Sequence, residues 1–217
     1  MKHAILMDGG FLKPKYKKAF RRRIEARDVS SLAAHLSEKH GNGHTLLRIY
    51  YYDSPPLDSE IRQPITNTPL NLKSTEVYRH QWKLLSELKK SDFVSVREGI
   101  LVFRGWEIKR KTLGGLGKAE QKNANLSDED FRANIQQKGV DTKLGPDMAW
   151  ISFCNVVDRV VILTGDSDFV PAIKAARRNG VQVILGTLGH GVMPSLANNV
   201  DVLDTTPIGE LYRGSGS

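Results

Sequence analysis

Aspartates follow two apolar runs of this chain at the point where each run ends. Asp8 comes directly after His3–Met7, and Asp166 and Asp168 come shortly after Val160–Leu163. In an open parallel sheet, ligands bind beyond the carboxyl ends of the strands, at the point where the strand order reverses. If both runs are strands that flank this point, the carboxylates of the three aspartates converge there.

Three carboxylates that converge repel one another, so either some take up protons or a cation sits among them. Oxygen ligands without a nearby His or Cys favour Mg²⁺ or Mn²⁺ over zinc. Such an ion can activate a water molecule and neutralise phosphoryl charge, which is what phosphodiester hydrolysis requires. Taken singly, the acids have a plainer interpretation, because Asp166 or the neighbouring Ser167 could simply cap a helix that begins at Phe169.

Two more acids precede the second of these runs. Asp141 ends the sequence Lys138-Gly139-Val140-Asp141, where Gly139 provides a turn and a helical segment begins. Asp147 follows Gly145-Pro146, and a proline is tolerated only near a helix start or at a bend. Asp141 could be an N-cap, and Asp147 could be a first-turn charge favoured by the helix dipole.

The elements that position these acids alternate between strand and helix. Nearly continuous apolar runs are typical of strands buried on both faces of a parallel sheet. The predicted strands are His3–Met7, Leu46–Tyr52, Val160–Thr164 and Val181–Leu185. The predicted helices between and around them are Ser30–His40, Asp147–Val157 and Phe169–Asn179. This order predicts an α/β fold with a doubly wound, mostly parallel sheet and helices on both faces.

The middle of the chain is less regular. Residues 53–74 contain four prolines and are expected to form a long loop, and residues 75–90 are expected to form a helix. Phe93–Arg97 and Ile100–Lys109 are predicted to pair as a hairpin or as edge strands. The polar, glycine-containing segment Arg110–Gln137 is expected to project from the sheet.

The bulk properties fit one soluble domain that binds a polyanion. The chain has 217 residues, of which 40% are hydrophobic, and a formal net charge of +8. We expect a single domain over residues 1–212, with 213–217 as a flexible tail. No apolar run reaches the length of a membrane span, so we expect no membrane contact. The single cysteine, Cys154, allows no internal disulfide, so we expect a cytoplasmic location. Cys154 itself is predicted to be a small buried side chain.

Three motifs together resemble the NYN domain, in the LabA-like branch of the PIN-like ribonucleases. They are Asp8-Gly9-Gly10-Phe11, Lys138-Gly139-Val140-Asp141, and Thr164-Gly165-Asp166-Ser167-Asp168-Phe169-Val170-Pro171. The resemblance implies a PIN-like sheet and a metal-dependent nuclease that cuts RNA, with single strands favoured. It also implies an acidic, metal-binding set for which the cofactor would be Mg²⁺ or Mn²⁺. The implied catalytic and metal ligands are Asp8, Asp141, Asp166 and Asp168, with Thr164, Ser167 and Asp147 close to them.

Basic side chains would hold the RNA backbone in such an enzyme. The candidates are Arg110, Lys111 and Lys118 in the polar segment, and Lys138 and Lys143 on either side of Asp141. As a set they predict salt-sensitive binding through counterion release, although each could singly be a solvated surface charge. Of the tryptophans, Trp106 is the candidate for base stacking, and Trp82 and Trp150 are predicted to lie in the core.

Alternative functions remain open at this point. A small-molecule phosphatase that uses an Asp nucleophile commonly has a second Asp two residues on, where this chain has Gly10. A non-catalytic module that binds RNA or a regulatory partner would keep the same acidic pocket, and DNA is not distinguished from RNA by any residue pattern. Residues 54–74 or 93–109 could also pair subunits in a homo-oligomer.

Overall fold

The computed structural model of the protein describes residues 1–116 and 126–212, except for the side chains of residues 115, 116 and 141. Within these ranges the core is one six-stranded sheet in which every neighbouring pair is parallel. The strand order is β10 (Val202–Asp204), β9 (Gln182–Gly186), β8 (Arg159–Leu163), β1 (Lys2–Asp8), β2 (Thr45–Asp53) and β5 (Val94–Glu98). From β1 the chain adds strands first on one side and later, from β8 onward, on the other. The strand order therefore reverses between β1 and β8, as the placement of the aspartates required.

The four predicted strands are confirmed as β1, β2, β8 and β9. Their apolar runs are continuous because both faces of the sheet are covered: five consecutive residues of β1 and four of β8 are buried. A helix-covered parallel sheet needs such runs, since neither face meets water. The predicted fold class is therefore confirmed.

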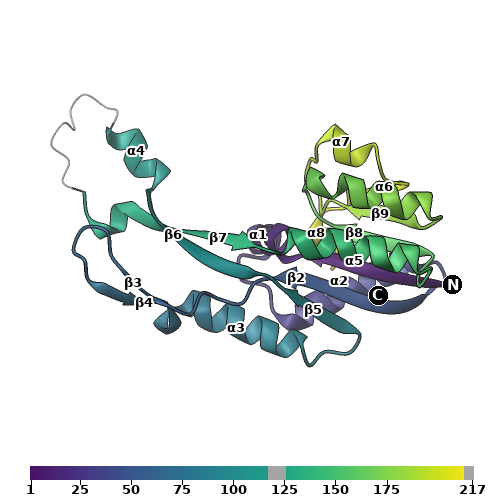
Figure 1. Ribbon diagram of the computed structural model, residues 1–217, viewed down its shortest axis with the longest axis horizontal. Helices are drawn as coiled ribbons and strands as arrows, with labels where there is room; N and C mark the ends of the chain where they lie inside the picture. Colours follow the sequence, from purple (N-terminus) through teal and green to yellow (C-terminus); the bar gives the residue numbers. More distant parts are fainter. Residues whose placement is uncertain (117–125, 213–217) are drawn as a thin grey trace.

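Helices cover each face of the sheet (Figure 1). On one face α1 (Gly9–Phe20), α2 (Ala26–Gly41), α3 (Glu76–Leu88) and α8 (Ile208–Leu211) pack around Ile5 and Met7. On the other face α5 (Asp141–Phe153), α6 (Val170–Arg178) and α7 (Pro194–Ala197) pack around Ala4 and Leu6. Successive residues of β1 thus point into opposite halves of the core.

The edge of the sheet at β10 is joined to the end of α2 by a buried acid. Asp204 accepts hydrogen bonds from Lys39, His40 and Thr206, at 3.0, 2.6 and 2.6 Å. Burial alone would raise the pKa of Asp204, but these hydrogen bonds outweigh it and hold the pKa below its ordinary value. The charged form of Asp204 therefore stabilises this edge.

An arm of two antiparallel strands extends from the sheet (Figure 1). It consists of β6 (Ile100–Ile108) and β7 (Phe131–Lys138), with α4 (Arg110–Leu116) and a short 3₁₀ turn, Asp128–Asp130, towards its far end. The excursion between β2 and α3 contains β3 (Glu60–Arg62), β4 (Pro69–Asn71) and the 3₁₀ turn Leu72–Ser74, and it lies along the arm. Trp106 donates its indole N–H to the carbonyl oxygen of Arg62 at 2.9 Å, which ties the two together.

The predicted pairing of Phe93–Arg97 with Ile100–Lys109 is wrong. Strand β5 pairs with β2 in the main sheet, whereas β6 leaves the sheet and pairs with β7. The chain changes partner at Gly99, whose N–H donates to the carbonyl oxygen of Asp53 at 2.8 Å. The described parts of the polar segment, residues 110–116 and 126–137, lie on the projecting arm as predicted, and residues 131–137 belong to β7. The predicted loop 53–74 contains two short strands, β3 and β4.

Helix α5 begins at Asp141, where the turn at Gly139 predicted a helical segment, and not at Asp147, where the apolar pattern placed the start; Pro146 lies inside the helix. The buried face of α5 carries Leu144, Met148 and Ile151, and Trp150 lies off this face and is 59% exposed. Trp82 on α3 is likewise 58% exposed, and Cys154 is exposed, so the predictions that these three residues are buried are wrong. Within the described ranges, none of the helices has the length and apolarity needed to cross a membrane.

Candidate functional site

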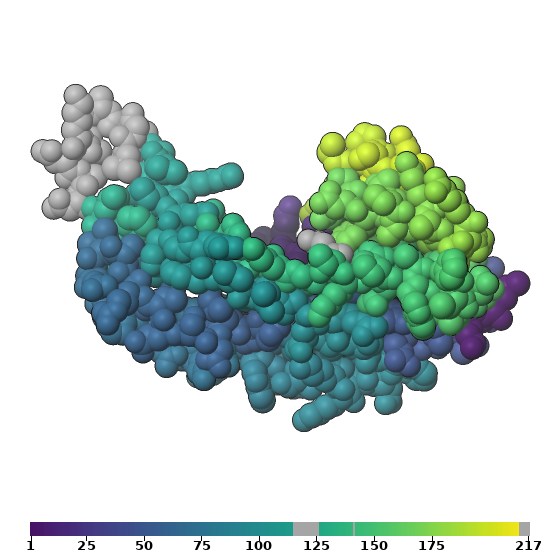
Figure 2. Space-filling model, in the orientation of Figure 1, coloured from purple at the N-terminus to yellow at the C-terminus, as the bar shows by residue number. Residues whose placement is uncertain are grey.

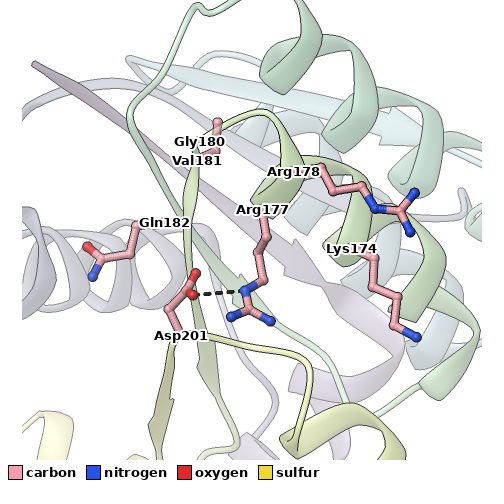
Figure 3. A pocket seen from close by; sticks show the side chains of 7 residues that line it. All are labelled: Lys174, Arg177, Arg178, Gly180, Val181, Gln182 and Asp201. Carbon is pink, nitrogen blue, oxygen red and sulfur yellow. Dashed lines mark hydrogen bonds and ion pairs between the residues drawn. The ribbon is translucent and has the colours of Figure 1, made fainter.

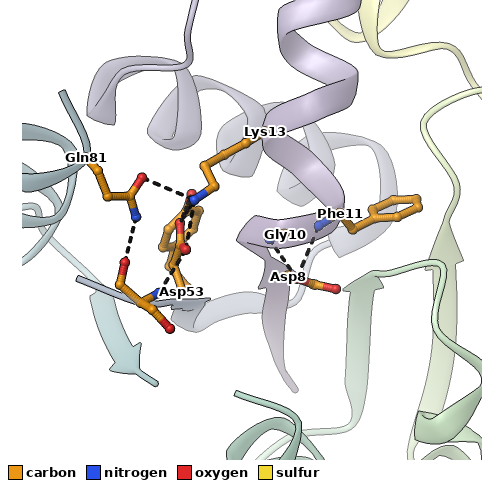
Figure 4. A network of polar contacts seen from close by, with 8 residues as sticks. Asp8, Gly10, Phe11, Lys13, Asp53 and Gln81 are labelled. Carbon is orange, nitrogen blue, oxygen red and sulfur yellow. Dashed lines mark hydrogen bonds and ion pairs between the residues drawn. The ribbon is translucent and has the colours of Figure 1, made fainter. Parts of the chain in front are cut away.

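Asp8 is fixed at the carboxyl end of β1 by the helix that follows it. It is the N-cap of α1, with an extended backbone, and its Oδ1 accepts from the N–H groups of Gly10 and Phe11 at 2.8 and 3.2 Å (Figure 4). Its Oδ2 accepts from the Thr164 hydroxyl at 3.4 Å. The carboxylate is therefore oriented by two hydrogen bonds from the start of α1 and one from Thr164 at the end of β8.

Asp166 reaches the same place from the end of β8. The fully buried Thr164 accepts from the Asp166 N–H through its Oγ1 at 3.2 Å, while that hydroxyl donates to Asp8. Asp166 in turn accepts from the N–H of Asp168 through its Oδ1, at 2.9 Å. One hydroxyl thus links the two acids across the point where the strand order reverses.

These acids line an open cavity of about 590 Å³ together with Phe11, Lys15 and His190. The Lys15 ammonium lies 3.5 Å from the centre of the Phe11 ring. Burial lowers the pKa of Lys15, and the Asp8 carboxylate acts in the opposite direction. Burial also lowers the pKa of His190, as do the charges of Lys15 and Lys18, which favours the neutral form of this ring. The cavity therefore combines acids with a cation and an imidazole.

Two glycines allow the close packing that brings the acids together. A side chain at Gly165 would put its Cβ 2.7 Å from the Phe11 ring, so only glycine lets the loop after β8 pass α1 at this distance. A Cβ at Gly9 would lie 2.7 Å from Oδ2 of Asp53 and 2.9 Å from the Tyr52 carbonyl oxygen. The start of α1 is thereby held against the end of β2.

Asp53 is an acid at this edge of the sheet that sequence reasoning missed. It is 1% exposed and lies 2.7 Å from the Lys13 ammonium (Figure 4). It also accepts from the N–H of Ser54 at 2.8 Å and from the hydroxyl of Tyr51 at 3.3 Å, and burial raises the pKa of Tyr51. The signal that singled out Asp8 was present here too, because Asp53 follows the apolar run Leu46–Tyr52.

The remaining predicted acids are placed differently. Asp168 is exposed, and Asp168 and Ser167 belong to the 3₁₀ turn Ser167–Phe169 beside the cavity rather than to its lining. Asp147 accepts from Arg97 at 2.9 Å and from the hydroxyl of Tyr52 at 3.1 Å. The Asp141 side chain lies outside the described part of the structure. Among the side chains that are described, no group of three or more His, Cys, Asp or Glu residues is arranged to hold a metal ion.

Three of the five predicted basic residues lie on the arm. Arg110 and Lys111 are exposed on α4 at its far end, and Lys138 lies at its base. Lys143 donates to the carbonyl oxygen of Glu98, and Lys118 lies outside the described residues. The cation in the acidic cavity itself is Lys15, which the sequence did not single out.

Figure 2 shows a concave surface between the arm and the part of the chain that forms α6 and α7. The carboxyl ends of β1 and β8 lie on this side of the sheet (Figure 1). The acidic cavity is therefore next to a hollow with walls on two sides, which is a suitable shape for an extended ligand.

A second cavity, of about 560 Å³, lies at the opposite edge of the sheet (Figure 3). Lys174, Arg177 and Arg178 line it at the end of α6, and Arg177 is 2.8 Å from Asp201. Because this cavity is near the amino end of β9, it is separate from Asp8 and Asp166, which lie at the carboxyl ends of the strands.

The oxygen atoms in the acidic cavity suit a hard cation. Asp8 and Asp166 both line the cavity and carry carboxylates, and the Thr164 hydroxyl lies between the Asp8 carboxylate and the Asp166 backbone N–H. Mg²⁺ is commonly bound by one or two carboxylates with water or substrate oxygens completing its shell. The described donors fit Mg²⁺ or Mn²⁺, and they do not fit a thiolate zinc site.

Comparison with known proteins identifies the family. The model of the NYN domain matches residues 2–203. A protein of unknown function from Vibrio parahaemolyticus RIMD 2210633, VPA0982, is 15% identical, with 94% of this chain and 91% of that chain covered and a TM-score of 0.49. A Sir2 mutant–p53 peptide–NAD structure is 12% identical, with 98% and 91% covered and a TM-score of 0.41. A search of curated proteins gave no match.

Proposed function

Because the chain belongs to the NYN domain family, which indicates a PIN-like nuclease, we propose that it is a metal-dependent ribonuclease of the LabA-like branch. The observation that carries this proposal is that Asp8 and Asp166 line one cavity at the reversal of strand order, where the Thr164 hydroxyl donates to the Asp8 carboxylate and accepts from the Asp166 backbone N–H. Each of the two carboxylates caps the turn that follows it, but capping alone does not require two caps to share one cavity. Asp141 and Asp168, from the flanking segments, would complete the acidic set.

The family also indicates the cofactor, since NYN and PIN-like nucleases usually use divalent metals. We assign Asp8 and Asp166 as the residues that would hold Mg²⁺ or Mn²⁺. When bound, such an ion supplies an activated water and neutralises charge on the phosphoryl oxygens.

The chain's own residues would position the phosphate. The N–H groups of Gly10 and Phe11 hold Oδ1 of Asp8, which leaves the carboxylate in one orientation during the reaction. Lys15, in the same cavity, would attract the phosphate that is cut and stabilise the negative charge that grows on it. The Phe11 ring keeps the Lys15 ammonium at the cavity wall.

The rest of the RNA would lie in the concave surface between the arm and α6–α7. Lys138 at the base of the arm, and Arg110 and Lys111 at its far end, are exposed and would contact phosphates. Each such contact releases counterions, so binding should weaken steeply with salt.

The test is cleavage of a labelled single-stranded RNA with Mg²⁺ or Mn²⁺. The variants are Asp8→Asn and Asp166→Asn, and the matched control is Asp92→Asn, an exposed acid in the turn before β5. We expect the wild type and the control to cut, both site variants to lose at least 100-fold in rate, and EDTA to stop the reaction. The products should carry 5′-phosphate and 3′-hydroxyl ends.

Other results would contradict this proposal in distinguishable ways. Cleavage that survives both site variants, or that leaves a 2′,3′-cyclic phosphate in excess EDTA, would place the activity elsewhere. Salt-sensitive RNA binding without any cleavage would support a non-catalytic binding module. A DNA strand of the same sequence, cut as fast as the RNA, would remove RNA as the preferred substrate.

A further inference from the structure

A third cavity, mostly apolar, lies beside the acidic one. It has a volume of about 300 Å³ and opens between α3, the excursion that contains β3 and β4, and the base of the arm. Its walls include Leu57, Val77, Leu101 and Ile135, and its polar lining includes Lys13 and Gln137. This volume is at the lower end of the range for small-molecule sites, so the cavity suits a single small ring system.

The face of the arm that lines this cavity is defined by strand register. Leu101 of β6 lies directly opposite Gln137 of β7, and Ile135 is two residues from Gln137 on the same face. Ile100, next to Leu101, points to the other face and does not line the cavity. The arm therefore presents two apolar side chains and one amide to the cavity.

The two cavities are neighbours. A Cβ placed on Gly10, which lines the acidic cavity, would lie 3.9 Å from Oε1 of Gln137, which lines the apolar one. Helix α1 contributes to both, with Lys15 in the acidic cavity and Lys13 in the apolar one. A ligand with an anionic group beside Lys15 and an apolar, planar group a few ångströms away could occupy both cavities at once.

The polar residues of the apolar cavity are held in place. Lys13 donates to Asp53 at 2.8 Å and to the side-chain oxygen of Gln81 at 3.1 Å, and Gln81 donates to the Ser54 carbonyl oxygen at 2.9 Å (Figure 4). Gln137 is exposed at the boundary between the cavities. Its amide has both donors and an acceptor, which is what the edge of a nucleobase requires.

We propose that this cavity is a nucleobase-binding subsite, which receives the base of a nucleotide whose phosphate lies beside Lys15 in the acidic cavity. A base has flat faces that pack against apolar walls and an edge that forms hydrogen bonds. RNA-binding proteins read unstacked bases by hydrogen bonds to their edges. Leu101 and Ile135 would contact the faces and Gln137 the edge. This inference rests on the proposed function, and it adds that cleavage depends on the base at one position.

The first experiment measures binding without metal and without turnover. Each of the four nucleoside 5′-monophosphates, and ribose 5-phosphate as the probe without a base, would be titrated into the full chain. We expect at least one nucleotide to bind roughly tenfold more tightly than ribose 5-phosphate, because burial of about 60 Å² of apolar base surface against Leu101 and Ile135 gives about this factor. Leu101→Trp, which fills the cavity, should remove the difference.

Two more variants make the result decisive. Ile135→Trp fills the same cavity from a different side chain. Because Ile135 is 38% exposed, this variant should fold even if Leu101→Trp does not. Ile100→Trp puts the same side chain on the neighbouring residue, which is 60% exposed on the other face, and should keep the tenfold difference. In RNA of mixed sequence, the wild type should cut with a preference for one base at a fixed position, and Leu101→Trp should cut without that preference.

The subsite is refuted if no nucleotide binds more tightly than ribose 5-phosphate, or if Ile100→Trp removes the difference as completely as Leu101→Trp. These outcomes leave the nuclease proposal untouched. Conversely, base-dependent binding that Leu101→Trp abolishes, in a protein that cuts no RNA, would support the subsite and contradict the proposed activity.

Discussion

Asp8 has two roles that different substitutions separate. Its Oδ1 caps α1 through the N–H groups of Gly10 and Phe11, and its carboxylate is a proposed metal ligand. Asn is as good an N-cap as Asp, but it is a much weaker ligand for a hard cation because it carries no charge. We therefore expect Asp8→Asn to keep the capped helix and lose the metal, whereas Asp8→Ala should lose both.

The size of the stability effect follows from the cap. Removing an N-cap side chain costs about 0.5–2 kcal/mol. In Asp8→Ala the Thr164 hydroxyl also loses its acceptor, so we expect about 1–2 kcal/mol. For a protein of this length that lowers the melting temperature by about 2–8 °C. Asp8→Asn should change it by less, since the cap remains and repulsion from Asp166 is reduced.

The effect on metal binding is measured by thermal unfolding at several Mn²⁺ concentrations. Wild type at 100 times its dissociation constant gains about 2.7 kcal/mol. If Asn weakens binding 100-fold, the same concentration stabilises the variant by only about 0.4 kcal/mol. Asp8→Asn should thus unfold near the wild-type temperature without metal and well below it with metal.

Two results would refute this reasoning. If Asp8→Asn shows the full metal-dependent rise in melting temperature and cuts RNA, Asp8 is not a metal ligand. If Asp8→Asn without metal is as unstable as Asp8→Ala, the negative charge of Asp8 matters to the fold more than its cap does. Asp92→Asn, measured alongside, controls for removal of one negative charge.

Three further predictions concern stability, measured by denaturant unfolding. Gly9→Ala places a Cβ 2.7 Å from Oδ2 of Asp53 and should cost about 1–3 kcal/mol, whereas Gly209→Ala, with no atom within 4 Å, should cost nothing. Lys13→Met leaves the buried Asp53 without its cation and should lower the free energy of unfolding by about 2–3 kcal/mol. This is somewhat less than for a fully buried pair, because the Lys13 side chain is 31% exposed. Adding Asp53→Asn should restore part of the lost stability. Asp204→Asn should cost about 1–3 kcal/mol at pH 7. The pKa of Asp204 is lower in the folded protein than in the unfolded chain, so its charged form stabilises the fold at pH 7. As the pH falls below about 4 the wild type loses this stabilisation, and the difference between wild type and Asp204→Asn should shrink.

The central sheet was predictable because its strands are buried on both faces. Such strands give continuous apolar runs, and β1, β2, β8 and β9 all follow this pattern. The ends of the runs also located Asp8 and Asp166, since parallel strands end at a common edge. What placed them side by side was the direct pairing of β1 with β8, which the sequence suggested only through chain order.

The arm was not predictable in the same way. Strands β6 and β7 are partly exposed over most of their length, so their apolar pattern is weak. The partner of Ile108 in β6 is Phe131, which lies within the polar segment and does not stand out as a strand residue. Phe93–Arg97 is closer in the sequence and therefore looked like a better partner, but it pairs with β2 in the main sheet. Local alternation identifies a strand but not its partner.

The positions of Asp53 and Asp147 show why an acid at the right edge of the sheet is not sufficient evidence for a metal ligand. A carboxylate that is taken out of water is stabilised only if a cation and hydrogen bonds compensate it. Asp53 has Lys13 at 2.7 Å, and Asp147 has Arg97 at 2.9 Å, from residues distant in the sequence. A metal ion at either acid would have to displace a cation that already fits, so we do not expect either to bind one. Asp147, grouped by the sequence with Thr164 and Ser167, is therefore better explained as an anchor that joins α5 to β5.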